Sequence, residues 1–196
     1  MKAWRLHFVW AVVSVEDQKT ADERIPYLLT TPAAVRGISY EPALAPVDLT
    51  EPLALWAIDE LRRRILEDKP SHPRDGKIDW VICGGESGRG ARPMHPDWAR
   101  SVRDQCVGAG VPFFFKQWGA WAPHHPVAGG DLGGDVHSGR VTIVHPTGQS
   151  DIEVFAASGR NTVPGSRFME RLGKKASGRM LDGVEWSMWP EVVVGE

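Results

Sequence analysis

Residues 78–121 read IDWVICGGESGRGARPMHPDWARSVRDQCVGAGVPFFFKQWGAW, and this stretch decides the fold. The apolar run 78–83 predicts a strand, and the glycine-rich residues 84–90 predict a turn at its end. His95 can cap a helix whose first residue is a proline, a position that suits proline because its missing N–H has no helical partner there. Residues 112–116 predict the next strand. The order strand, turn, helix, strand is typical of a parallel α/β protein.

The N-terminal part of the chain repeats this alternation. Residues 8–15 are apolar and rich in valine, which predicts a strand buried on both faces. Thr20, with an acid three residues later, predicts a capping box that opens a short helix. Residues 35–40 predict a second strand, and Thr50 predicts the cap of another helix. Four strands are too few for a closed barrel. We therefore expect an α/β fold, a partial parallel (β/α) barrel of about four strands, over residues 1–121.

The remaining residues, 122–196, lack the regular alternation of strand and helix patterns. They predict a loop-rich C-terminal extension packed on the partial barrel as one compact unit. Residues 141–145 and 152–156 flank a Pro-Thr-Gly turn and predict an antiparallel hairpin. Residues 166–172 predict a short helix. Asp182–Gly183 predicts a turn before an irregular, aromatic tail.

The composition excludes some classes of protein. The chain has 196 residues and a net charge of -2, so no overall attraction to nucleic acid follows, although a local basic surface remains open. We find no run of about 18 apolar residues, so we expect no membrane span. Two cysteines without CxxC spacing fit a reducing cytoplasm.

Polar side chains follow the predicted strands, at the edge where parallel α/β folds bind ligands. Crowded carboxylates raise one another's pKa, which suits a general acid, whereas pairing with nearby cations would make them scaffold. We assign no catalytic residue from these groups. The candidates for a ligand rim are Glu16, Glu41, Glu86, Ser87 and Lys116.

The glycine-rich loop can bring bare backbone N–H groups close to an anion. The loop matches neither the dinucleotide nor the P-loop pattern, so a tight strand-exit turn is the alternative. The anion-binding candidates are Gly84, Gly85, Arg89 and Arg92. The histidines and aspartates between residues 124 and 145 match no metal-ligand spacing, and we predict no metal site there.

Basic residues and tryptophans near the two ends of the chain can form a surface for nucleic acid or an acidic protein. Charge runs are more often simply solvated. The partner-binding candidates are Trp4, Trp10, Arg167, Arg171, Lys174, Lys175 and Arg179.

Five motifs together resemble an uncharacterised phage family, labelled domain of unknown function 5131. In chain order they are VSVEDQKTADERIPYLL, TPAAVRGISYEPALAPVDL, DWVICGGESGRGARPMHPDWARSVRDQC, GVPFFFKQWGAW and LGKKASGRMLDGVEW. The resemblance covers most of the chain outside residues 122–164. It implies a fold similar to the partial (β/α) barrel of radical S-adenosylmethionine enzymes.

The chain departs from the family pattern at the cofactor. The resemblance implies a three-cysteine motif for a [4Fe–4S] cluster near the N-terminus of full-length members. This chain resembles only the C-terminal part of the pattern, and it has Cys83 and Cys106 alone. A cluster needs about three or four positioned thiolates, so we expect no iron–sulfur cluster and no other cofactor. An incomplete barrel also leaves its first strand as an edge, which we expect a second copy, the C-terminal hairpin or a foreign partner to cover.

Two functional hypotheses remain open. The first is a phage or mobile-element accessory protein that acts by binding, for example a counter-defence inhibitor of a host nucleic-acid-guided or restriction complex. Its partner would be a host or phage macromolecule, or a second copy through the first strand, in the cytoplasm of an infected or lysogenic bacterial cell. The alternative is an enzyme subunit that binds S-adenosylmethionine or a nucleotide. We favour binding over catalysis because the cluster motif is missing.

Overall fold

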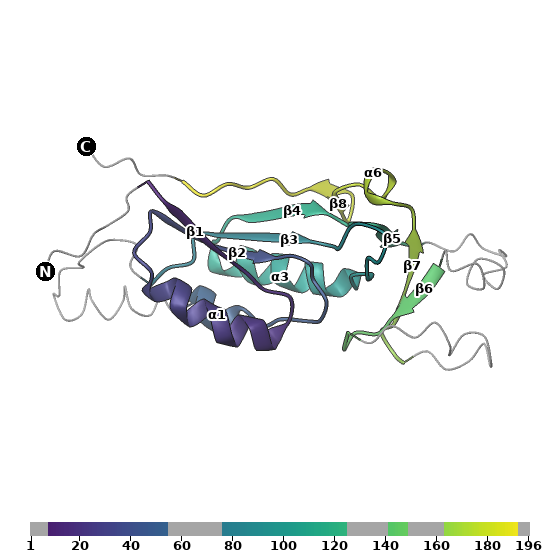
Figure 1. The fold of residues 1–196 in the computed structure, drawn as a ribbon, viewed down its shortest axis with the longest axis horizontal. Helices are drawn as coiled ribbons and strands as arrows, with labels where there is room; N and C mark the ends of the chain where they lie inside the picture. The colour runs from purple at the N-terminus through teal and green to yellow at the C-terminus, as the bar shows by residue number, and fades with distance from the viewer. Residues whose placement is uncertain (1–7, 55–75, 125–140, 149–162, 192–196) are drawn as a thin grey trace, which may run out of the picture.

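The fold is built on a parallel sheet of four strands, in the order β1-β2-β3-β4. We analysed a computed structural model, which describes residues 8–54, 76–124, 141–148 and 163–191. The four strands are β1 (Trp10–Ser14), β2 (Val35–Tyr40), β3 (Trp80–Gly84) and β4 (Phe113–Gln117). Helices α1 (Gln18–Thr30) and α3 (Pro96–Ala109) lie on the same face of this sheet (Figure 1). The predicted parallel α/β architecture is confirmed.

The first helix begins earlier than the sequence predicted. Asp17 is its N-cap: the Asp17 carboxylate accepts the Thr20 N–H at 2.8 Å, and the Thr20 hydroxyl accepts the Asp17 N–H at 3.1 Å. The predicted capping box, opened by Thr20 itself, is therefore wrong by one helical turn. For α3 the prediction is confirmed, because His95 is the N-cap and its Nδ1 accepts the Asp97 N–H at 3.1 Å.

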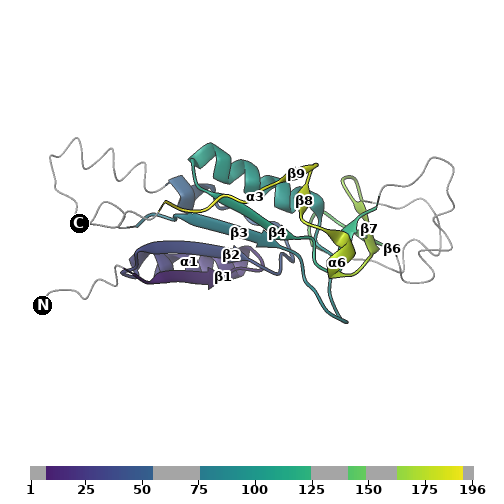
Figure 2. The same ribbon diagram turned by 90° about the horizontal axis from the view of Figure 1, so that it is seen from above.

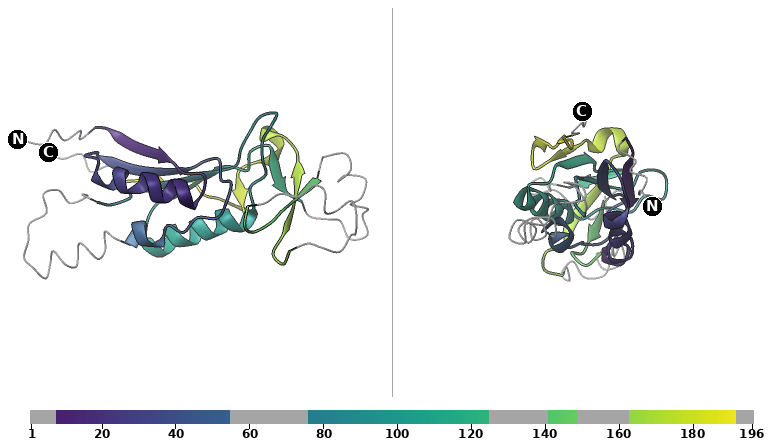
Figure 3. Two further views of the ribbon diagram at one scale, coloured as in Figure 1. Left: turned by 60° about the horizontal axis from the view of Figure 1, so that its bottom comes forward. Right: turned by 90° about the vertical axis from the view of Figure 1, so that its left-hand side faces the viewer.

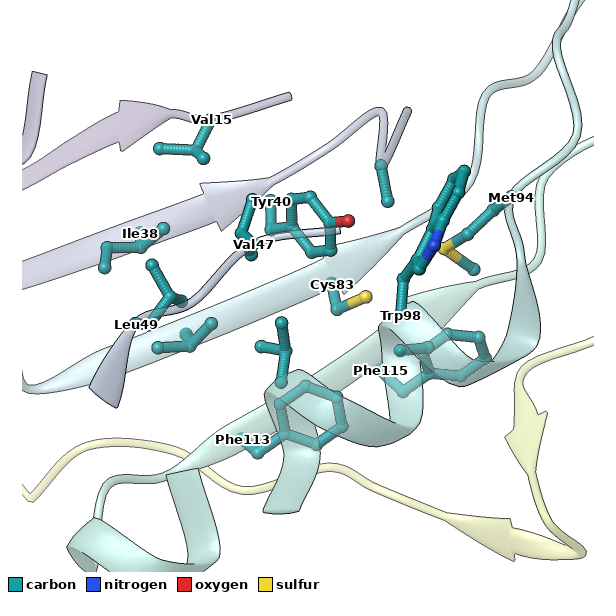
Figure 4. Packing of buried hydrophobic residues seen from close by; sticks show 14 of the residues in the cluster. Val15, Ile38, Tyr40, Val47, Leu49, Cys83, Met94, Trp98, Phe113 and Phe115 are labelled. Atoms are coloured by element: carbon teal, nitrogen blue, oxygen red, sulfur yellow. The ribbon is translucent and has the colours of Figure 1, made fainter. Parts of the chain in front are cut away.

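The hydrophobic core fills the space between the two helices and the sheet. Figure 4 shows Tyr40, Cys83 and Phe115, from three neighbouring strands, on the side of the sheet where Trp98 of α3 lies. These side chains are almost completely buried. Burial of aromatic and aliphatic side chains is the main contribution to the stability of the fold. The helix-covered face of the sheet is therefore used for the hydrophobic core.

A second sheet lies beyond the carboxyl ends of the parallel strands (Figure 3). It is antiparallel, in the order β5 (Trp121–Pro123), β7 (Arg167–Arg171) and β6 (Val141–Val144). The predicted helix over 166–172 is wrong, because this segment is the central strand β7, paired on both sides. The predicted hairpin strand 152–156 lies outside the described residues, and β6 pairs with β7.

The C-terminal segment closes one edge of the parallel sheet. After α6 (Lys174–Ser177), strands β8 (Met180–Leu181) and β9 (Val184–Glu185) form a small hairpin. The tail then runs along β4 (Figure 2), where the Phe115 N–H donates to the Trp186 carbonyl at 3.0 Å and the Met188 N–H to the Phe113 carbonyl at 3.2 Å. The outer edge of β4 is therefore covered by the chain itself. Among the described residues, no helix has the length and apolar character to cross a membrane.

Asp182 fastens the β8–β9 turn to helix α3. Its backbone φ is 55° and that of Gly183 is 78°, so both turn residues are left-handed, as a two-residue hairpin requires. The Asp182 carboxylate lies 2.7 Å from Arg100 Nη2 and 2.8 Å from Arg103 Nη1. Hydrogen bonds from Arg100 and then Arg103 lower the pKa of Asp182 to about 2. The contribution of this carboxylate to stability is full above its unfolded pKa and is lost as the pH falls through about 2.

We therefore expect Asp182→Asn to lower the free energy of unfolding by about 1 kcal/mol at pH 7, a value reduced for solvent screening. Asparagine tolerates the left-handed backbone, so the change tests the charge alone. Urea unfolding at several pH values is the measurement. The difference between wild type and variant should shrink as the pH falls from about 4 toward 2. A difference that does not depend on pH would contradict the role of the charge.

Candidate binding face

One face of the parallel sheet is left open by the helices. Register pairs join Val12 with Gly37 and Ser14 with Ser39, so side chains at these alternate positions point away from α1 and α3. Residues on this side do not belong to the hydrophobic cluster between helices and sheet. We call this surface the open face; it comprises Trp10, Val12, Ser14, Gly37, Ser39, Trp80, Ile82, Phe114 and Lys116.

The amino-terminal half of the open face is aromatic. Trp80 lies at its centre, with ring centroids 5.8 Å from Trp10 and 5.9 Å from Phe114. Trp189 from the C-terminal tail lies 4.7 Å from Trp80, whose indole N–H donates to the Met188 carbonyl at 2.9 Å. Trp10 remains 39% exposed and Trp189 59%. This half therefore presents large apolar side chains to solvent.

The carboxyl-terminal half of the open face is polar. Lys116 Nζ lies 3.0 Å from Glu41 Oε2. Gly84 makes room for this pair, since a Cβ at Gly84 would come within 2.7 Å of Glu41 Oε1. Of the predicted rim residues, the structure brings Glu41 and Lys116 together at the edge where parallel α/β folds bind ligands.

The other predicted rim residues have partners of their own. Glu16 pairs with Arg24 at 3.1 Å, on the α1 side of the strand end. Glu86 accepts the backbone N–H of Arg92 at 2.8 Å and its guanidinium at 2.8 Å, and the hydrogen bond from the Arg92 side chain is the main reason why the pKa of Glu86 is lowered. Ser87 is exposed in the same loop. These groups do not converge on the Glu41–Lys116 pair.

Backbone groups at the start of the glycine-rich loop already make hydrogen bonds to neighbouring segments of the protein. The Gly85 N–H donates to the Gln117 carbonyl at 2.9 Å, and the Gly84 carbonyl accepts the Ala43 N–H at 3.0 Å. Arg92 is held by Glu86, so the loop already carries an internal carboxylate as its anion. Arg89 is exposed, without a carboxylate partner in the part of the chain that the structure describes.

Strand β1 is an edge of the parallel sheet on its outer side. Backbone groups of successive residues point to opposite edges of a strand. The Val15 N–H donates to Ser39 of β2, so the backbone groups of Trp10, Val12 and Ser14 point outward. The Ser14 carbonyl takes a hydrogen bond from Arg24 at 2.7 Å. Within the described ranges, no strand pairs with this outer edge.

The predicted basic cluster divides into two groups. Arg167 lies 3.2 Å from Asp97 and Arg179 lies 3.3 Å from Glu185, so these two serve as scaffold. Arg171 donates to backbone carbonyls, and Lys174 and Lys175 are exposed on α6. Trp4 lies outside the described residues, whereas Trp10 belongs to the open face.

The two cysteines do not fit an iron–sulfur cluster. Cys83 of β3 and Cys106 of α3 are buried free thiols in the core. Burial raises the pKa of Cys106 to about 12 and also raises that of Cys83, so both favour the protonated form over the thiolate that a cluster requires. Where the structure describes the chain, it holds no cluster of three or more His, Cys, Asp or Glu residues arranged to ligate a metal.

A histidine–serine pair on the second sheet does not form an activated nucleophile. His145 Nδ1 lies 2.8 Å from the Ser166 hydroxyl. That hydroxyl donates its proton to the Val163 carbonyl at 2.6 Å, so it accepts from the imidazole. A nucleophilic serine would instead donate to the histidine. The pair therefore fixes the turn that precedes β7.

Sequence reasoning did not single out the aromatic residues Trp80 and Phe114 of the open face, nor Trp189, whose ring packs against both. The signal for Phe114 was present, because the central residue of a Phe-Phe-Phe strand must face away from its neighbours. Only the placement of α1 and α3 on one side shows that no helix covers this face where the structure describes the chain.

Comparison with known proteins adds a family but no activity. The family model described as "Protein of unknown function (DUF5131)" matches residues 1–190. No curated protein and no solved structure matches the chain significantly.

Proposed function

Since this chain belongs to the DUF5131 family of proteins of unknown function, we propose from the geometry of its open face that it acts by binding another protein. The observation that carries the proposal is an exposed aromatic surface beside the outer edge of β1, with which no strand of the described residues pairs. Tryptophan is enriched at protein interfaces, and a free edge offers main-chain hydrogen bonds to an added strand. The partner supplies an extended segment that pairs with β1 and lays apolar side chains over Trp10 and Trp189.

The two edges of the sheet differ in a way that limits the partner. The tail occupies the outer edge of β4, so a second copy cannot close a ring by placing its β1 there. Pairing of β1 with the same strand of a second copy across a two-fold axis is the alternative arrangement. We place a foreign polypeptide on the β1 edge, and light scattering that reports a dimer would instead favour the homodimer.

The biological setting rests on the resemblance. We propose an accessory protein of a phage or mobile element, with the fold of a partial radical S-adenosylmethionine-like barrel and without its cluster. Such a protein would act in the cytoplasm of the infected or lysogenic cell. Blocking a host nucleic-acid-guided or restriction complex is the role we favour, because it requires binding and no chemistry.

Site-specific photo-crosslinking tests the proposed surface. We expect a benzophenone amino acid at Val12, which is 44% exposed on the open face, to give a defined adduct with one cellular protein. The same group at Tyr27, which is 76% exposed on α1, is the control and should give none. The Val12 adduct should weaken in a Trp189→Ala background. Equal labelling from both positions, or none from Val12 while the protein is folded, would refute the proposal.

A small-molecule role is the second candidate, and the Glu41–Lys116 pair favours it. The pair sits at the carboxyl end of the strands, where an ammonium and a carboxylate can bind the amino acid part of S-adenosylmethionine or a nucleotide phosphate. The chain would then be a subunit of an enzyme. Calorimetry with each ligand separates the two roles, since binding that is lost in Lys116→Ala supports the second candidate and absence of heat removes it.

A further inference from the structure

The cations around the carboxyl ends of β3 and β4 are not equivalent. Four of them are neutralised by carboxylates: Arg92 by Glu86, Arg179 by Glu185, Arg167 by Asp97 and Lys116 by Glu41. Four others have no carboxylate partner in the described ranges of the chain. We call these four the basic lip; they are Arg89, Arg171, Lys174 and Lys175.

Hydrogen bonds join the two segments that carry the basic lip. Residues 118–121 lie between them. On one side the Ala120 N–H donates to the Glu86 carbonyl at 2.8 Å, which fixes the loop that bears Arg89. On the other side the Leu172 N–H donates to the Ala120 carbonyl at 3.1 Å, and the Trp118 N–H donates to the Gly178 carbonyl at 3.2 Å. The segment with α6 is thus attached to the same residues as the loop.

Contacts with the loop that carries Arg89 fix the orientation of Arg171. Its Nη2 donates to the Gly88 carbonyl at 3.1 Å and also to the Arg89 carbonyl. Its guanidinium lies 5.4 Å from the centroid of the Trp121 ring. A guanidinium fixed in this way loses little conformational freedom when it meets an anion, and its planar fork matches the geometry of phosphate.

We propose that the basic lip binds the phosphate backbone of nucleic acid, without reading its sequence. Several uncompensated cations from two hydrogen-bonded segments match a polymer that carries one charge per nucleotide. An acidic protein segment fits less well. Arg171 lies on the central strand of its sheet, so that strand has no free edge to bind a peptide backbone. This site is separate from the open face and goes beyond the proposed protein binding.

Fluorescence anisotropy with a labelled oligonucleotide of about 20 nucleotides, single-stranded or duplex, tests the proposal. With about four phosphate contacts, the affinity of the intact chain should fall on the order of a hundredfold between about 50 and 200 mM salt. Lys174→Glu should weaken binding about tenfold and make the salt dependence shallower by about one contact. Lys19→Glu makes the same change of charge on the exposed part of α1 and should leave binding nearly unchanged.

Three outcomes would overturn the proposal. The first is no salt-dependent binding by the folded wild-type chain. The second is an equal loss in Lys174→Glu and Lys19→Glu, which would indicate only net charge. The third is competition by a polyglutamate peptide of the same charge that is as strong as by unlabelled DNA, which would assign the lip to acidic proteins. Trp189→Ala should retain nucleic-acid binding, so failure here is distinguishable from failure of the open face as a protein-binding surface.

Discussion

Replacing Gly85 with alanine is expected to lower the free energy of unfolding by about 3 kcal/mol or more. A Cβ at Gly85 would lie 2.0 Å from the Trp118 carbonyl oxygen and 2.7 Å from its carbon. The atoms it meets belong to the backbone, so no side-chain rotation can relieve the clash. The Gly85 N–H also donates to the Gln117 carbonyl, and the forced displacement would strain that bond. Denaturant unfolding followed by circular dichroism measures the loss.

Gly90→Ala is the matched control within the same loop. A Cβ at Gly90 meets nothing within 4 Å, so we expect a change of less than about 0.5 kcal/mol. Gly119→Ala should resemble Gly85→Ala, since its Cβ would lie 2.1 Å from the Glu86 carbonyl oxygen and its φ is +85°. A stable Gly85→Ala protein would show that the loop and the strand exit do not pack as closely as described.

The close packing at Gly85 also matters for the proposed nucleic-acid site. Gly85 and Gly119 allow two backbones to pass in direct contact, which keeps the Arg89 loop beside the segment that carries Arg171. The glycines of this loop therefore allow two segments of the chain to pack closely against each other. This use of glycine was one of two alternatives at the level of sequence, where an anion-binding loop and a tight turn look alike.

The parallel sheet could be predicted from sequence because its signals are local. Residues 35–40 form the second strand as predicted, and His95 caps α3 with Pro96 after it. The helix predicted over 166–172 failed for a different reason. The strand Arg167–Arg171 contains residues that favour a helix, and only pairing with β5 on one side and β6 on the other makes it extended.

The candidate site was less predictable because pairing between side chains depends on the folded loops. The sequence showed Glu16, Glu41 and Glu86 at equivalent strand ends. In the fold, Arg24 of α1 neutralises Glu16, and Arg92 neutralises Glu86 within the glycine-rich loop. The basic cluster behaved in the same way, since Arg167 and Arg179 find acids that no spacing rule indicates. The candidate surfaces that do not consist of these ion pairs are the open face and the basic lip. Neither of them corresponds to a sequence motif.

Trp80→Ala is the second substitution for which we expect a large effect, a loss of about 3–5 kcal/mol in the free energy of unfolding. Trp80 is only 7% exposed and contacts the rings of Trp10, Phe114 and Trp189. Its indole N–H also holds the carbonyl of Met188, so its removal would release the tail from the outer edge of β4. Hydrogen exchange should then accelerate at the Phe115 and Met188 amides, which bond across this edge.

Trp189→Ala separates stability from binding at the same cluster. Because Trp189 is mostly exposed, its truncation should lower the free energy of unfolding by about 1 kcal/mol or less, while it weakens the crosslink from Val12. A Trp80→Phe protein should lie between the two, since it keeps an aromatic ring and loses the bond to Met188. If Trp80→Ala and Trp189→Ala were equally mild, the aromatic half of the open face would not anchor the tail, and the backbone hydrogen bonds of Trp186 and Met188 would hold it on β4 without that help.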